Sequence, residues 1–184
     1  MTVALTRIAL FAALIAVLGI VPRLELAAGV PITAQSLAVM LAGSVLGARR
    51  GALAVLLFLT LVLLGLPLLA GGRGGLGVLA GPTVGYIIGF PIAAFVIGLI
   101  VERRGRIPIA VASFIGSVAG GLVILNLLGA LGMAWRLSVP FAEALALTLA
   151  FVPGDLVKAA LAAILTQALA RARPQLWQRE TRPA

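Results

Sequence analysis

Apolar residues fill long stretches of the chain, and polar residues are gathered in short segments between them. Each stretch approaches the length of about 20 residues that an α-helix needs to cross a bilayer. The stretches are continuous and do not alternate apolar with polar positions, which excludes a membrane β-barrel and favours helices. The pattern predicts an all-α integral membrane protein, a six-transmembrane-helix bundle with spans over residues 5–21, 33–48, 51–70, 82–101, 108–133 and 154–172.

A seventh apolar segment, Phe141 to Phe151, is too short to cross a bilayer. Pro153 and Gly154 divide it from the last predicted span, so we expect a short interfacial or re-entrant helix there. Residues 1–173 are expected to form one six-helix membrane domain, and residues 174–184 a cytoplasmic basic tail. The first apolar stretch is interpreted as the first of several spans, not as a signal peptide, because five more follow it.

The amino-acid composition also indicates an integral membrane protein. The 184 residues are 62% hydrophobic and only 10% charged, more apolar surface than a soluble domain of this size could bury. The net charge of +9 comes from arginines at the ends of apolar stretches, where they act as topology signals. No basic patch interleaved with aromatic residues is present, so nucleic acid is not a predicted partner.

Charge also predicts the orientation. With six spans, both termini lie on the same side of the membrane. One side would carry ten arginines and the other side three, so the richer side is predicted to be cytoplasmic. The ten are Arg7, Arg49, Arg50, Arg103, Arg104, Arg106, Arg171, Arg173, Arg179 and Arg182; the three are Arg23, Arg73 and Arg136.

The sequence argues against enzymatic chemistry. It contains no cysteine and no histidine, which removes thiolate and imidazole metal ligands and the common nucleophile–base pairs. The glycine-rich segment 71–77 is not a Walker A loop, because the only lysine in the chain is followed by Ala159. We therefore expect no catalytic residues, no metal and no cofactor in this chain.

Asp155 and Lys158 are the most unusual residues of the last predicted span. They are three positions apart, share a helix face and lie near the outer surface in the predicted topology. Charges at membrane depth usually face a cavity or a partner. They could bind a polar ligand, or they could be a structural ion pair near the interface.

Other polar residues, and residues at the predicted starts of helices, lie near the same outer surface in the predicted topology. Arg73 can hold a carboxylate with two hydrogen bonds, but it could also be a solvated loop residue. Asn126 offers donors and acceptors, but it could also join two helices. Trp135 and Arg136 follow in the next outer loop. The candidate ligand-binding set comprises Asp155, Lys158, Asn126, Tyr86, Gln35, Arg73, Thr33, Gly81 and Thr83, with Ser36 beside them.

The cytoplasmic half of the predicted bundle contains almost no buried polar residues, a pattern that fits capture from outside better than autonomous pumping. In the first span, Ala9 and Ala13 form a stripe of small residues. Such a stripe allows another membrane helix to approach closely, either from a partner or from within the same bundle.

Three segments of the chain resemble the signatures of a known family. Residues 77–91 read GVLAGPTVGYIIGFP and are similar to the GPT-x-GY-x-x-GF signature of BioY, with Val84 where glycine is usual. Residues 31–35, PITAQ, and residues 153–159, PGDLVKA, are similar to its V-P-x-T-x-Q and P-G-D-x-x-K segments. BioY is the biotin-specific S-component of energy-coupling-factor (ECF) transporters.

The resemblance implies a substrate-binding subunit for biotin in a prokaryotic plasma (inner) membrane, with the pocket open to the outside. It further implies docking, through small residues such as Ala9 and Ala13, on a transmembrane T-component joined to two ABC-type ATPases. Two alternatives stay open from the sequence: an S-component for another vitamin, such as thiamine or riboflavin, and a membrane interaction protein that transports nothing.

Overall fold

The computed structural model describes residues 2–21, 24–25 and 31–173, most of which are helical. The predicted tail 174–184 and the loop residues Pro22 and Arg23 lie outside the described residues. In chain order the elements are α1 (Thr2–Ile20), β1 (Leu24–Glu25), β2 (Pro31–Ile32), α2 (Gln35–Leu46), α3 (Ala48–Leu63), η1 (Leu76–Ala80), α4 (Val84–Glu102), α5 (Ile109–Gly116), η2 (Ser117–Ile124), α6 (Leu125–Leu137), α7 (Phe141–Thr148), η3 (Leu149–Phe151) and α8 (Val152–Ala172).

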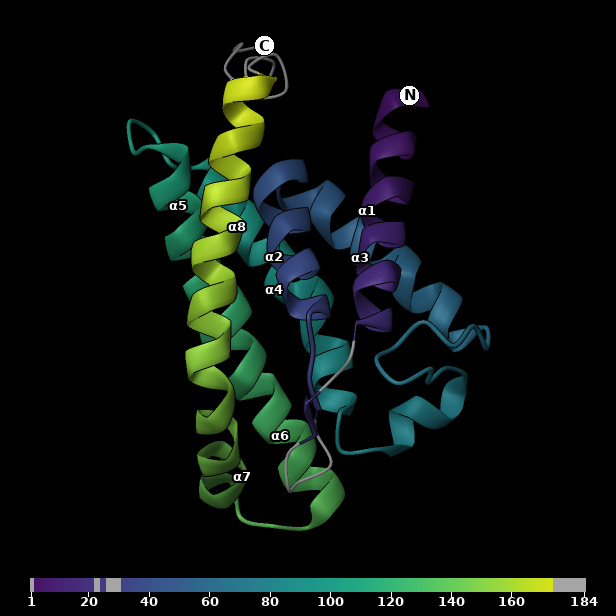
Figure 1. Ribbon diagram of the computed structural model, residues 1–184. Helices are drawn as coiled ribbons and strands as arrows, with labels where there is room; N and C mark the ends of the chain where they lie inside the picture. The colour runs from purple at the N-terminus through teal and green to yellow at the C-terminus, as the bar shows by residue number, and fades with distance from the viewer. Residues whose placement is uncertain (1, 22–23, 26–30, 174–184) are drawn as a thin grey trace.

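The helices form one elongated bundle (Figure 1). Among the described residues, four helices are long and apolar enough to cross a membrane: Thr2–Ile20, Val84–Glu102, Ile109–Leu137 and Phe141–Ala172. A shorter apolar helix, α2, packs against α1, α3, α4 and α8 and buries nearly all of its residues. The structure thus confirms an all-helical architecture with several apolar helices of membrane-spanning length.

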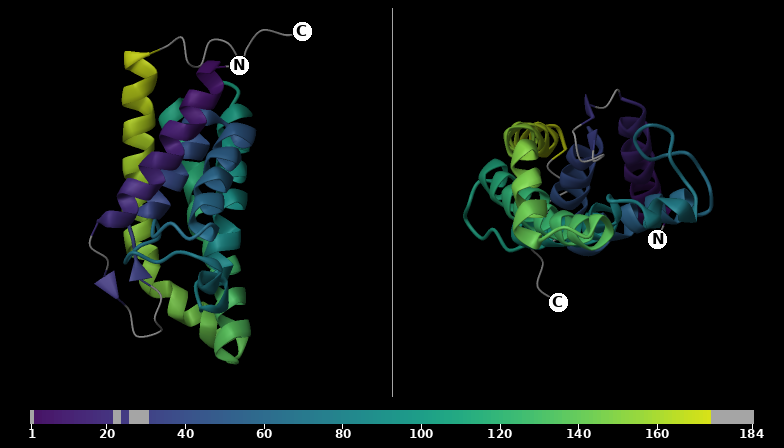
Figure 2. Two further views of the ribbon diagram at one scale, coloured as in Figure 1. Left: turned by 90° about the vertical axis from the view of Figure 1, so that its right-hand side faces the viewer. Right: turned by 90° about the horizontal axis from the view of Figure 1, so that it is seen from below.

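The start of α1 and the end of α8 lie at the same end of the bundle, and η1 and α7 lie toward the other end (Figures 1 and 2). Helix α1 is peripheral: it packs on α2 and α3 and leaves one side exposed. Helix α4 lies among α2, α3, α5 and α6, so it connects the two sides of the bundle.

Glycines allow α4 to approach its neighbours closely. A Cβ added at Gly98 would meet the backbone of Ala48, and one added at Gly85 would meet the backbone of Leu128 on α6. Small residues of this kind let membrane helices pack backbone against backbone. The consequence is a close contact between α4 and α6 near the cavity described below.

The third predicted span, residues 51–70, is wrong at both ends. Helix α3 begins at Ala48, whose backbone N–H donates to Glu102 Oε1 at 2.8 Å, and it ends at Leu63. It stops early because Gly65 adopts a left-handed φ of 108° and Pro67 follows. Residues 64–75 therefore form a loop, and this loop carries Arg73.

The helices observed at the fifth and sixth predicted spans are longer than the predicted spans. Residues 109–137 form one helix with a π-helical middle, η2. The segment 141–151 was predicted to be divided from the last span, but α7 runs through the 3-10 turn η3 directly into α8. Pro153 does not interrupt this helix because it lies in the first turn of α8, where its missing N–H would have no partner.

The expectation of almost no buried polarity in one half of the bundle is also wrong. Ser44, Ser113, Ser117 and Thr166 are buried on α2, α5, η2 and α8, and both α5 and the end of α8 lie in the half that contains the start of α1. Ser113 Oγ lies 2.8 Å from Ser44 Oγ and 3.4 Å from Thr166 Oγ1. All four groups are neutral hydroxyls, small enough to hide between close-packed helices, so hydropathy alone did not show them.

Candidate functional site

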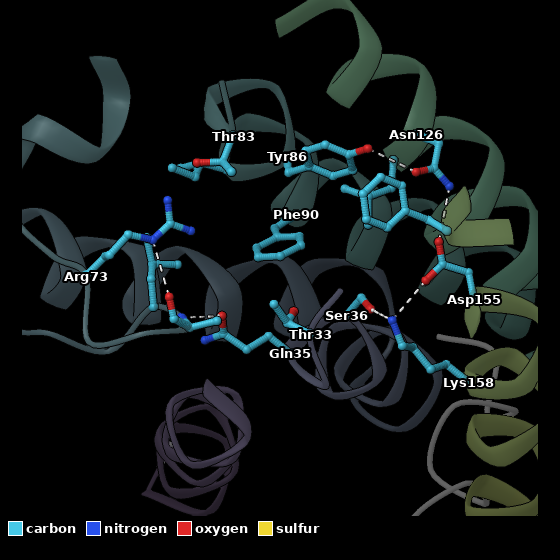
Figure 3. A pocket seen from close by; sticks show the side chains of 15 residues that line it. Thr33, Gln35, Ser36, Arg73, Thr83, Tyr86, Phe90, Asn126, Asp155 and Lys158 are labelled. Atoms are coloured by element: carbon cyan, nitrogen blue, oxygen red, sulfur yellow. Dashed lines mark hydrogen bonds and ion pairs between the residues drawn. The ribbon is translucent and has the colours of Figure 1, made fainter. Parts of the chain in front are cut away.

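A cavity of about 590 Å³, including its open mouth, lies at the opposite end of the bundle from these hydroxyls. The cavity wall combines polar groups at two ends with apolar side chains between them (Figure 3). It is lined by Thr33, Gln35, Ser36, Leu69, Ala70, Arg73, Thr83, Tyr86, Ile87, Phe90, Leu125, Asn126, Phe151, Asp155 and Lys158.

One end of the cavity holds a chain of hydrogen bonds from four helices. The Tyr86 hydroxyl donates to Asn126 Oδ1 at 3.2 Å, and Asn126 Nδ2 donates to Asp155 Oδ2 at 3.2 Å. Lys158 Nζ donates to Asp155 Oδ1 at 3.0 Å and to Ser36 Oγ at 2.9 Å (Figure 3). We call Tyr86, Asn126, Asp155, Lys158 and Ser36 the polar network.

Because the Asp155–Lys158 ion pair is buried, both of its charges need hydrogen-bond partners. The side chains of Asp155 and Lys158 are 7% and 14% exposed. Two charges taken out of water are held only if each finds hydrogen-bond partners. Asn126 and Ser36 supply part of this need, and the remaining lone pairs and protons of the pair can serve a polar ligand. The network is therefore prepared to exchange hydrogen bonds with a neutral group that both donates and accepts.

Arg73 lies at the other end of the cavity, in the loop between α3 and η1 (Figure 3). Its Nε donates to the carbonyl oxygen of Ala70 at 3.3 Å. Thr33 and Thr83 line the wall nearby, and Thr83 Oγ1 is buried with no hydrogen-bond partner among the described residues. A guanidinium in a cavity wall that also carries threonine hydroxyls is suited to an anionic group such as a carboxylate.

The middle of the cavity is apolar. Phe90, Ile87, Leu125 and Phe151 line it, and Phe151 packs edge-on against the Tyr86 ring at a centroid distance of 6.0 Å. An edge-to-face pair of this kind fixes both rings. The sequence interpretation did not select these residues, although Phe90 lies one helical turn after Tyr86 and could have been found from that spacing.

The structure brings together eight of the nine predicted ligand-binding residues. Asp155, Lys158, Asn126, Tyr86, Gln35, Arg73, Thr33 and Thr83 all line the cavity, whereas Gly81 is not among the residues that line it. A Cβ added at Gly81 would meet only the Val78 carbonyl oxygen, at 3.8 Å. Gly81 lies just before α4 in the chain. Its place in the sequence motif does not distinguish this position from that of a residue that contacts the ligand.

Trp135 and Arg136 are also outside the cavity lining. The Arg136 guanidinium stacks over the Trp135 ring at 4.3 Å and donates from Nη2 to the Leu79 carbonyl oxygen at 2.6 Å. This contact joins α6 to η1 instead of facing a ligand. Nor do the described residues contain a group of three acidic, histidine or cysteine side chains that could hold a metal ion.

Comparison with known proteins gives a consistent result. The family model described as "BioY family" matches residues 1–175. The chain is similar to the biotin transporter BioY of Rhodobacter capsulatus, with 52% identity over 92% of this chain and 94% of that protein. It is similar to the probable biotin transporter BioY of Bacillus subtilis, with 44% identity over 89% and 90%.

A solved structure is similar as well. It is the crystal structure of "the S-component for biotin from an ECF-type ABC transporter", with a TM-score of 0.88 and 31% identity. The similarity covers 92% of this chain and 92% of that chain. Because the similarity extends over nearly the whole of both chains, the two proteins share one overall fold.

Proposed function

We propose that this chain, which belongs to the BioY family, is the biotin-binding membrane subunit of a biotin uptake system. Its relatives are named as transporters and the match covers 94% and 90% of their lengths, so it is a transport protein and not an enzyme. The observation that supports biotin as the ligand is the arrangement of the cavity. The polar network lies at one end and the Arg73 guanidinium lies at the other.

Biotin matches the two ends of this cavity. Its ureido ring has two N–H donors and one carbonyl acceptor, and its valerate chain ends in a carboxylate. We assign the ureido ring to the polar network, where Asp155 accepts from N–H and Lys158 or Asn126 donates to the carbonyl. The carboxylate then reaches Arg73, and the thioether ring and alkyl chain lie against Phe90 and its apolar neighbours.

The other vitamins considered from the sequence fit less well. A cationic ligand such as thiamine needs a carboxylate that is not already neutralised. Asp155 is the only acidic residue among the described residues that line the cavity, and Lys158 is paired with it. Riboflavin carries no carboxylate, so it offers no anionic group to the Arg73 guanidinium at that end of the cavity.

We further propose six spans with both termini in the cytoplasm of a prokaryotic cell, in its plasma membrane. The shared position of the α1 start and the α8 end supports an even number of crossings (Figure 1). That end also carries Arg7 and Arg171, in agreement with the positive-inside rule. On this topology residues 1–173 form the membrane domain, and residues 174–184 extend from it as a cytoplasmic tail.

The proposed partners are a transmembrane T-component and two ABC-type ATPases of an ECF module. Support comes from α1: Ala9 and Ala13 are exposed, whereas Ala12 and Ile15 face the bundle. The alternative of packing within the same bundle is therefore disfavoured by this geometry. An exposed stripe of small residues permits close approach of a helix from a partner.

A test of the function is uptake of labelled biotin by cells that lack their own biotin transporter and express this chain, with and without an ECF module. Uptake that depends on the chain and is competed by unlabelled biotin, but not by thiamine or riboflavin, is expected. Competition by another vitamin at equal concentration would reassign the ligand. Absence of any chain-dependent uptake in the presence of the module would contradict a transport role.

A further inference from the structure

One amide side chain joins three separate parts of the molecule beside the cavity. Gln35, in the first turn of α2, is 2% exposed. Its Nε2 donates to the carbonyl oxygen of Ile15 in α1 at 3.2 Å and to that of Leu68 at 3.0 Å. Its Oε1 accepts from the backbone N–H of Ala70 at 3.1 Å. We call this set of three hydrogen bonds the Gln35 tie.

The Gln35 tie uses almost all the hydrogen-bonding capacity of the amide. A glutamine side chain has two N–H donors and one oxygen with two lone pairs. Both donors are engaged, so only one lone pair remains. A ligand carboxylate only accepts hydrogen bonds, and Gln35 could donate to it only by breaking the tie. Its position in the cavity wall therefore suits a role that acts through other residues.

The tie holds the base of the turn that carries Arg73. The Leu69 N–H donates to the Arg73 carbonyl oxygen at 3.0 Å, and the Arg73 N–H donates back to the Leu69 carbonyl oxygen at 3.2 Å. Arg73 Nε bonds the Ala70 carbonyl oxygen within the same turn. Gln35 thus anchors Leu68 and Ala70, on either side of Leu69, at the base of the turn that carries Arg73 (Figure 3).

Close approach of α1 supports the same arrangement. Gly19 is buried on the side of α1 that faces the loop. A Cβ added there would lie 2.6 Å from Gln35 Nε2 and closer still to the Leu68 carbonyl oxygen. Real Cβ atoms do not tolerate such contacts, so glycine at position 19 permits the tie to form.

We propose that Gln35 is a positioning residue that ties α1 and residues 68–73 to α2 and so holds Arg73 at the carboxylate end of the cavity. The ligand part of this inference rests on the proposed function. The tie itself does not, because it is a property of the protein without ligand. Removing the tie should weaken binding of the carboxylate specifically and should loosen the turn.

The binding test compares biotin with biotin methyl ester, in which the carboxylate is neutralised. Gln35→Met keeps the length of the side chain without its hydrogen bonds, and Gly19→Ala disturbs the tie from α1. The matched controls are Ser113→Ala, which removes a buried hydroxyl at the other end of the bundle, and Gly77→Ala, whose Cβ would meet nothing within 4 Å. All proteins are purified and shown to be folded before titration.

Both tie variants should bind biotin about 10- to 100-fold more weakly than wild type, the loss expected for one hydrogen bond to a charged group. Their affinity for the methyl ester, and both affinities of the controls, should stay within about threefold of wild type. Equal weakening of the two ligands, or unchanged biotin affinity, would overturn the inference. A wild-type chain that binds neither ligand would instead contradict the proposed function.

A labelling test needs no ligand. Ala70 is 1% exposed and the chain has no cysteine, so Ala70→Cys provides a single buried thiol in the turn. In the Gln35→Met background its reaction with a thiol reagent should accelerate at least tenfold, the equivalent of about 1.4 kcal/mol of lost protection. A thiol from Ala162→Cys, also buried, should react equally slowly in both backgrounds. An unchanged labelling rate at position 70 would show that Gln35 does not hold this turn in place.

Discussion

Removing both charges of the Asp155–Lys158 pair separates a ligand site from a structural ion pair. Asp155→Asn alone leaves the ammonium without its counter-charge. Truncating one partner of a buried pair lowers the free energy of unfolding by about 3–5 kcal/mol. We expect the low end of this range, because Lys158 is 14% exposed and keeps its hydrogen bond to Ser36.

The double variant Asp155→Asn/Lys158→Met should recover most of that stability, to within about 1 kcal/mol of wild type, because neutral replacements of a buried pair are often tolerated. Biotin affinity should not recover. Each hydrogen bond to a charged group contributes about 1.5–3 kcal/mol, so loss of both charges should weaken biotin by a hundredfold or more. A charge swap is a poorer test, because Asn126 Nδ2 donates to Asp155 and would then face an ammonium.

The assay pairs denaturant unfolding of each purified variant with a biotin titration of the folded protein. Glu143→Gln is the control for Asp155→Asn: it is the same class of change at an exposed position on α7, and it should alter neither quantity. The reasoning fails if the double variant is as stable as wild type and binds biotin within about threefold of it. That result would make the pair part of the scaffold and place the ureido ring elsewhere.

Three further predictions follow from topology, docking and packing. In intact cells a membrane-impermeant thiol reagent should label Leu76→Cys, which replaces a highly exposed residue, and not Arg106→Cys; the reverse pattern would invert the orientation. Ala13→Trp should abolish co-purification with the T-component while leaving biotin affinity within about threefold, since position 13 is exposed on α1; loss of binding as well would place this face inside the bundle. Gly129→Ala should lower biotin affinity at least about tenfold in a titration, because its Cβ would overlap the Tyr86 ring, and unchanged affinity would show that this ring does not shape the cavity.

Local spacing made the polar network predictable. Asp155 and Lys158 are three apart on one helix, and charges are so rare in this chain that the pair was conspicuous. Tyr86 and Asn126 could be placed at the same end of the bundle once the spans were ordered. The hydrogen bonds among them required the structure, because they depend on how four helices meet.

The hydrogen bonds of Gln35 could not be predicted from the sequence. A glutamine at the start of a helix near other polar residues predicts a ligand contact, and nothing in the sequence shows that backbone groups at positions 15, 68 and 70 use its amide. The loop that supplies two of them was itself predicted to be helix, although Gly65 and Pro67 were signals against it. Phe151 was missed because its segment was separated from α8.

Direct titration of the purified chain in lipid nanodiscs tests the central claim most directly. Biotin should bind at a single saturable site, and thiamine and riboflavin at the same concentrations should give no saturable binding. Asp155→Asn/Lys158→Met in the same nanodiscs should lose the biotin signal while remaining folded. A folded wild-type chain that fails to bind biotin, or that binds thiamine or riboflavin in preference to it, would contradict the account.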